Sequence, residues 1–234
     1  MNACRLLRFL LVTMTAALPL ASARAGTIVR FDTNLAVFDV ELFDSAMPIT
    51  VANFLSYVSG SSYTSTLIHR STTYNRADIQ IIQGGGFLLS GNQLLPVATS
   101  APIVLESGTA TNLRGTIAMA RGTATDSATS QFFFNVQDNP ALNGSYAVFG
   151  TVVGAEGLAA LDAIGAVPVY DASVQLGSAF GELPLTNPSL APSSLVLVTS
   201  VTAMPEPSAA LLAAVGLGAA ATFRRRRPLR TSTP

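Results

Sequence analysis

The chain has 234 residues, of which 49% are hydrophobic and only 11% are charged, and its formal net charge is zero. It contains one cysteine and one histidine. This composition excludes thiol redox chemistry, and it leaves too few soft ligands for a transition-metal site, so we expect neither a metal nor a cofactor.

The first 25 residues have the pattern of a signal peptide. Two arginines precede an apolar run over residues 9–20, and the segment closes on Ala23-Arg24-Ala25, which is an Ala-x-Ala cleavage pattern. Pro19 interrupts the run, which argues against the alternative of a first buried helix. We therefore expect residues 1–25 to be removed on export. The exported chain then loses Cys4 and contains no disulfide.

Residues 26–203 are predicted to form one domain that opens with a hairpin and a helix. The runs 27–31 and 36–42 are separated by turn residues and have the composition of half-buried β-strands. Pro48 then begins an apolar stripe at helical spacing, and Gly60 ends it. One face of this helix is expected to pack on the sheet.

The rest of the domain alternates short apolar runs with turn residues, which predicts a mainly β fold. Strands are expected over residues 79–82, 116–120, 131–136, 146–153 and 195–201. A second helix is expected over 155–164, and the three glycines at 84–86 indicate a tight turn after a strand. Residues 171–194, rich in Gly, Pro, Ser and Asn, predict a long surface loop. Composition alone does not separate a closed barrel with capped ends from a sandwich.

Residues 204–234 form a tail with three parts. A Pro-Glu-Pro motif at 205–207 leads into an uncharged apolar run over 208–223, and four arginines follow at 224–227. Sixteen residues fall short of the roughly 20 that cross a membrane comfortably, but the arginine cluster suits an anchor whose C-terminus stays in the cytoplasm. The layout resembles the PEP-CTERM sorting signal of bacterial proteins.

That resemblance implies cleavage near the Pro-Glu-Pro motif by a membrane-embedded exosortase and release of the protein to the cell exterior. A permanent membrane anchor by the C-terminal helix is the alternative. In either case we expect an exported protein, located in the periplasm, at the cell surface or outside the cell.

Removal of both ends changes the charge of the chain. Between Gly26 and Ala203 there are 12 acidic residues and five arginines, which leaves a net charge of −7. An acidic surface repels the phosphate backbone of nucleic acids, so the sequence argues against an RNA or DNA partner.

Six motifs spread over residues 27–201 carry a family resemblance. They lie, in chain order, at 50–54, 68–70, 83–87, 115–121, 126–136 and 146–150. Together they resemble the cyclophilin-type peptidyl-prolyl cis-trans isomerases of bacteria, especially the periplasmic ones. The resemblance implies a closed antiparallel eight-stranded β-barrel capped by two α-helices. It also implies proline-containing polypeptides as substrates.

The reaction that this resemblance implies is rotation about an Xaa-Pro amide bond, whose barrier is on the order of 20 kcal/mol. Rotation needs no nucleophile, but it is helped by a donor that draws the prolyl nitrogen lone pair out of resonance. Arg70 matches the family's catalytic arginine, and an arginine stays charged at any physiological pH. Gln83 and Gln131 match the glutamines that orient this arginine and the substrate backbone.

The resemblance also assigns the residues that hold the substrate. The walls of the proline pocket are Ile81, Phe133 and Leu142, the stretch that pairs with the peptide is Ala120 and Arg121, and Tyr146 stands where eukaryotic members have a histidine. For the three wall residues, ordinary core packing is the alternative. His69, beside the arginine, is expected to be structural, because no second histidine or cysteine accompanies it.

Two departures from the family pattern weaken the expected proline pocket. The 12 residues 71–82 between the arginine and the glutamine form a longer spacer than usual, and counting back puts Gln80 where an aromatic residue normally lines the pocket. Ala141 stands in place of a Trp or Phe. Cyclosporin-type ligands, which in the family contact that Trp, are therefore expected to bind poorly.

The sequence leaves more than one function open. The first is an active isomerase that accelerates Xaa-Pro rotation in exported proteins. The alternative is a catalytically weak module that binds proline-containing peptides of an extracellular matrix, and a purely structural matrix component is a third.

Overall fold

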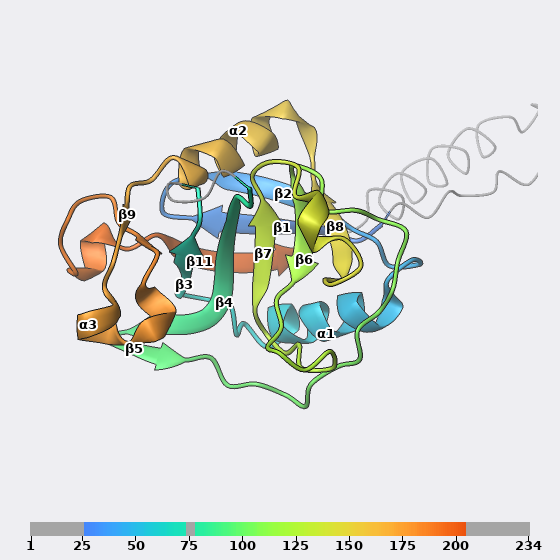
Figure 1. Cartoon of the computed structure of the whole chain (residues 1–234), viewed down its shortest axis with the longest axis horizontal. Helices are drawn as coiled ribbons and strands as arrows, with labels where there is room; N and C mark the ends of the chain where they lie inside the picture. Colours follow the sequence, from blue (N-terminus) through green and yellow to red (C-terminus); the bar gives the residue numbers. More distant parts are fainter. Residues whose placement is uncertain (1–25, 74–77, 205–234) are drawn as a thin grey trace, which may run out of the picture.

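In the computed structural model, which describes residues 26–73 and 78–204, an antiparallel sheet closes on itself (Figure 1). Around the barrel the strands are β3 (Thr66–Ser71), β11 (Leu197–Ala203), β1 (Ile28–Thr33), β2 (Val37–Leu42), β8 (Val148–Val152), β6 (Thr116–Met119), β7 (Phe132–Asn135) and β4 (Ile81–Ser90). Strand β4 pairs back with β3, and β5 (Gln93–Pro96) extends β4 outside the ring. The predicted closed eight-stranded barrel is confirmed. The predicted signal peptide and sorting tail lie outside the described residues.

The first hairpin joins β1 to β2 as the sequence predicts. The Thr33 hydroxyl accepts hydrogen bonds from the backbone N–H of Leu35 and of Ala36, which fixes the turn. The register places Phe31 opposite Phe38, and their rings stack with centroids 5.3 Å apart. Both rings are buried in the barrel interior.

Strand β7 carries three successive phenylalanines that face alternate sides of the sheet. Phe132 and Phe134 belong to the interior core, where their rings meet the Phe31 ring edge-on at 5.5 and 5.3 Å. Phe133 belongs instead to a separate apolar cluster with Ile81. Because side chains alternate along a strand, this triplet fills the core and one site on the outer face of the barrel at once.

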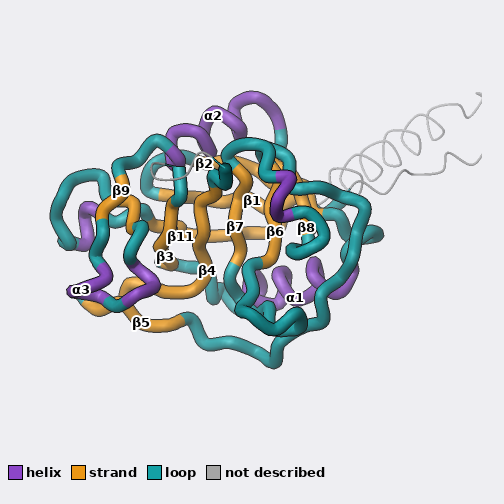
Figure 2. Tube along the Cα trace, viewed as in Figure 1, coloured by secondary structure: helices purple, strands orange, loops and turns teal. Residues whose placement is uncertain are grey.

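Two helices cover the ends of the barrel and lie on opposite sides of it in Figure 2. Helix α1 (Pro48–Ser59) begins at Pro48, and the Glu106 carboxylate accepts hydrogen bonds from the backbone N–H of Ile49 and Thr50 at its first turn. Helix α2 (Gly154–Gly165) buries Leu161 and Ile164. Both predicted helices are confirmed. No helix within residues 26–73 and 78–204 has the length and apolar character to cross a membrane.

The glycines at 84–86 are a correction to the sequence prediction. They lie inside β4, not in a turn after a strand. Gly85 has a φ of +75°, and a Cβ there would lie 2.7 Å from the Ser130 carbonyl oxygen. These glycines therefore allow the backbone of β4 to bend and to approach its neighbours closely.

The segment 171–194 is a second correction, because it is not only a surface loop. It contains α3 (Ser173–Leu176), strand β10 (Leu183–Pro184), which pairs with β9 (Val169–Tyr170), and the short 3-10 helices η2 (Ser178–Phe180) and η3 (Pro192–Ser194). Phe180, Leu183 and Leu185 are buried against Leu67 of β3. The apolar residues of this segment are scattered among turn residues. They therefore show no strand or helix periodicity from which their burial could be predicted.

Candidate functional site

A cavity of about 400 Å³ opens on the outer face of the barrel. All nine residues that the sequence assigns to the site line it: Arg70, Ile81, Gln83, Ala120, Arg121, Gln131, Phe133, Leu142 and Tyr146. Five further residues that the sequence analysis did not assign to substrate contact also line it: His69, Thr72, Ile79, Phe87 and Ala179. The structure thus brings residues from five of the six motifs, and from the segments between and after them, to one concave surface.

Strand register places the central residues of the cavity in a row. Arg70 on β3 is paired with Gln83 on β4, and Gln83 is in turn paired with Phe133 on β7. Phe133 is paired with Ala118 on β6, which belongs to the same apolar cluster. Paired residues on neighbouring strands project to the same face of a sheet. A cation, an amide and an aromatic ring are therefore adjacent because of the register of the sheet.

A chain of polar contacts crosses the cavity. Arg70 Nη1 donates to Gln83 Oε1 over a long 3.4 Å, and Gln83 Nε2 donates to Gln131 Oε1 at 2.8 Å. On the other side of the guanidinium, Arg70 Nε donates to Glu182 Oε2 at 2.8 Å. Glu182 was not predicted from the sequence, because it lies in the segment read as a surface loop.

An apolar cup lies beside this polar chain. It consists of Ile79, Ile81, Phe133, Leu142 and Tyr146, of which Ile81 and Phe133 are buried and the other three are partly buried. The Tyr146 ring stands edge-on to the Phe133 ring at 5.3 Å. The cup can hold a small apolar ring and exclude water from it.

Arg121 lies at the rim of the cup. Its guanidinium carbon is 5.2 Å from the centre of the Tyr146 ring, a cation–π distance. Its Nε donates to the Ser145 carbonyl at 2.8 Å, and its Nη1 donates to the Gly122 carbonyl at 3.0 Å. These contacts fix the side chain where it lines the cavity.

The two departures from the family pattern have different outcomes. Ile79 lines the cavity in the region where counting along the sequence put Gln80, which is a correction. The Gln80 backbone is instead tied to the Asn139 side chain, with hydrogen bonds of 2.9 and 3.0 Å. Ala141, in the 3-10 helix η1 (Pro140–Leu142), is exposed and does not line the cavity.

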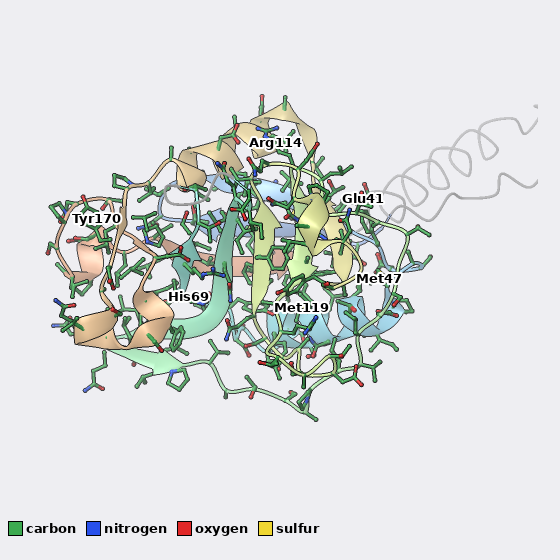
Figure 3. The ribbon with its side chains drawn as sticks, in the orientation of Figure 1. Glu41, Met47, His69, Arg114, Met119 and Tyr170 are labelled. Carbon is green, nitrogen blue, oxygen red and sulfur yellow. The ribbon has the colours of Figure 1, made fainter. Side chains whose placement is uncertain are left out.

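His69 lies at the edge of the cavity, between β4 and the segment that carries α3 (Figure 3). It is 3% exposed and stands edge-on to the rings of Phe87 and Phe180. Burial lowers the pKa of His69 to about 4, and the charge of Arg70 acts in the same direction, so the ring is neutral at pH 7. Its Nδ1 atom finds no hydrogen-bond partner among the described residues. Within the same part of the chain, no three His, Cys, Asp or Glu side chains gather as a metal site would require.

Comparisons with known proteins agree with this geometry. The model of the family described as cyclophilin type peptidyl-prolyl cis-trans isomerase/CLD matches residues 28–178. A peptidyl-prolyl cis-trans isomerase of Acinetobacter baylyi is 44% identical over 154 residues, which are 63% of this chain and 77% of the relative. Peptidyl-prolyl cis-trans isomerase B of Escherichia coli is 40% identical over 146 residues, 58% of this chain and 83% of the relative.

A solved structure shares the fold. It is a cyclophilin type peptidyl-prolyl cis-trans isomerase of Cryptosporidium parvum, crystallised in the presence of the dipeptide Ala-Pro. It superposes with a TM-score of 0.54 at 23% identity, and the match covers 76% of this chain and 99% of that chain.

Proposed function

The chain belongs to the cyclophilin-type peptidyl-prolyl cis-trans isomerases, and on that premise we propose that Arg70 accelerates Xaa-Pro rotation in exported proteins while the apolar cup holds the proline ring. The observation that carries this proposal is the row of Arg70, Gln83 and Phe133 on three adjacent strands. It sets a permanent cation and an apolar ring site side by side in one cavity.

Arginine suits the proposed step because of what limits the reaction. The barrier, on the order of 20 kcal/mol, comes from the partial double bond between the carbonyl carbon and the prolyl nitrogen. At the twisted transition state the nitrogen lone pair is no longer delocalised and can accept a hydrogen bond. A guanidinium N–H of Arg70 directed at that nitrogen interacts with the transition state more strongly than with either planar ground state, which is the condition for catalysis.

The other cavity residues hold the two ends of the rotating bond. The apolar cup removes the proline ring from water, which contributes about 25 cal/mol per Å² of apolar surface buried. We assign Gln131 and the stretch Ala120–Arg121 to the substrate backbone, because they line the same cavity next to the cup. With the ring held, the carbonyl that precedes the proline is the part that swings.

The location and processing of the protein are part of the proposal. We propose export through the signal-peptide pattern of residues 1–25 and processing of the tail 204–234 by an exosortase-type enzyme, with membrane attachment by its apolar run before cleavage. The support for both proposals is the amino-acid sequence of these two segments. Mass spectrometry of secreted material checks both cleavages, and an intact N-terminus or a retained arginine cluster at 224–227 contradicts the corresponding one.

The catalytic proposal is tested by cis-trans exchange of an Ala-Pro peptide with purified protein. Arg70→Ala is expected to lower kcat/KM by about a hundredfold or more, since it removes the transition-state donor. Arg30→Ala is the matched control, because Arg30 forms an ion pair with Asp39 on the surface, away from the cavity. Circular dichroism verifies that both variants fold. Saturable peptide binding by a folded wild-type protein without acceleration would instead favour the matrix-binding module.

A further inference from the structure

We propose that Glu182 is a positioning residue of the isomerase reaction, whose carboxylate holds the Arg70 guanidinium so that its Nη groups face the cavity. The inference rests on the proposed function of Arg70. Glu182 itself is not among the residues that line the cavity, so it acts through Arg70 and not on the peptide.

The geometry of the pair explains how such positioning works. Glu182 Oε2 accepts from Arg70 Nε at 2.8 Å, and Nε is the guanidinium nitrogen next to the alkyl chain. A contact at this atom fixes the plane of the guanidinium and leaves both Nη groups for other partners. One of them, Nη1, is the group that approaches Gln83 Oε1 at 3.4 Å.

Arg70 needs such a constraint because its side chain is not buried deeply enough for packing alone to hold it in one conformation. A third of it is exposed, 33%, and a long arginine side chain loses rotamer entropy when it becomes ordered. The contact to Gln83 is too long to order it alone. The short bond to Glu182 is the stronger of the two restraints.

The backbone ties Glu182 to the strand that carries Arg70. The backbone N–H of Ser71, the residue after Arg70, donates to the Glu182 carbonyl at 2.8 Å. On either side of Glu182, Phe180 is 4% exposed and Leu183 is fully buried, and both belong to one apolar cluster. The backbone of Glu182 is therefore held at a fixed position relative to Arg70, although the two residues are 112 positions apart in the sequence.

Stability alone gives a weak reason for this ion pair. A partly exposed ion pair adds little to the stability of the fold, because water screens it and both side chains lose freedom in forming it. Glu182 also lies beyond residues 28–178, the part of the chain that the family model matches, so that match assigns it no role. A carboxylate that only reduced the charge of the arginine would oppose catalysis, which leaves orientation as the useful contribution.

Two conservative variants separate the effect of the length of the Glu182 side chain from the effect of its charge. Glu182→Gln keeps the length of the side chain and an oxygen acceptor but loses the charge, so kcat should stay within about threefold of wild type. Glu182→Asp keeps the charge but withdraws the acceptor by one methylene, so kcat should fall about tenfold or more, as misplacement of a catalytic group does. In both variants the Kd of the peptide should change by less than about twofold, because Glu182 does not contact it. Exchange NMR over a titration with Ala-Pro peptide that ends at saturation measures both quantities.

The controls distinguish this inference from the proposed function. Glu156→Ala, on the exposed face of α2, should leave both quantities unchanged. Adding Glu182→Asp to Arg70→Ala should cause no further loss, since a positioning residue has nothing left to position. Wild-type kcat in Glu182→Asp, an equal loss in both conservative variants, or an additive loss in the double variant would each overturn the positioning role. If Arg70→Ala alone keeps full activity, it is the proposed function that fails.

Discussion

Gln83 Nε2 donates a hydrogen bond of 2.8 Å to Gln131 Oε1, which links strand β4 to the residue that precedes β7. The same Gln83 amide presents its oxygen to Arg70 Nη1. An amide has one donor end and one acceptor end, so the bond to Gln131 decides that the oxygen of Gln83 faces the arginine. Gln83 is therefore held by its bond to Gln131 and in turn restrains the Arg70 guanidinium.

Gln83→Ala is expected to lower kcat/KM by about tenfold or more, because it removes one of the two contacts that hold the Arg70 guanidinium. The fold should persist, since Gln83 is only partly buried. Isomerisation of an Ala-Pro peptide measures the effect. Gln93→Ala, at an exposed position on β5, is the control and should retain wild-type activity. Unchanged kcat/KM in Gln83→Ala would mean that the amide does not orient the arginine.

The exposed Ala141 is expected to limit the binding of cyclosporin-type ligands. The family resemblance places a Trp or Phe at this position, and a large aromatic ring can bury 150 Å² or more. Wild-type protein should therefore bind cyclosporin more weakly than about 1 μM, which corresponds to about −8 kcal/mol, and Ala141→Trp should tighten binding at least tenfold. Calorimetry with both proteins decides this. A sub-micromolar Kd for the wild type contradicts the prediction.

Buried His69 is expected to make folding stability depend on pH. Its pKa is lowered to about 4 in the folded protein from 6.5, so between these values the unfolded chain binds a proton that the folded chain excludes. The free energy of unfolding should therefore fall as the pH falls from 7 to 4, with a slope of up to about 1.4 kcal/mol per pH unit from this group.

Urea unfolding at several pH values measures this slope in the wild type and in His69→Gln. The carboxylates are the same in both proteins, so the difference between the two curves isolates His69. The variant should lose less stability between pH 7 and pH 5. Parallel curves would show that His69 does not titrate in this window.

Gly85 and Gly91 are expected to respond differently to the same substitution. Both have positive φ, +75° and +61°, so alanine costs each about 1–2 kcal/mol of backbone strain. At Gly85 the new Cβ would also lie 2.7 Å from the Ser130 carbonyl oxygen and 3.0 Å from the rings of Phe132 and Tyr63, whereas at Gly91 it would meet nothing within 4 Å.

Gly85→Ala should therefore lower the free energy of unfolding by about 1–3 kcal/mol more than Gly91→Ala, because overpacking a close contact costs about that much beyond strain. Chemical denaturation of the two variants provides the comparison. Equal losses would show that β4 can shift away from Ser130 at little cost.

Much of the barrel could be predicted because its signals are local. The first hairpin and both helices follow from alternation, from helical spacing and from Pro48 at a helix start, and all of these patterns act within a few residues. The nine predicted cavity residues came from the resemblance to a family, and the structure brings them to one surface. The glycines at 84–86 were misread because glycine marks a turn and a close strand approach equally well, and only the neighbour Ser130 decides between them.

By itself, then, the sequence determined the first hairpin, both long helices and the family, and it pointed to Arg70 as the arginine of the site. Only the tertiary structure decided what surrounds that arginine. Closure of the barrel sets the pairing of Arg70 with Gln83, and the packing of Phe180 and Leu183 brings Glu182 to Arg70. A contact across 112 residues leaves no periodic signal in the chain, because it depends on the summed burial of many apolar side chains and not on the residues at its two ends.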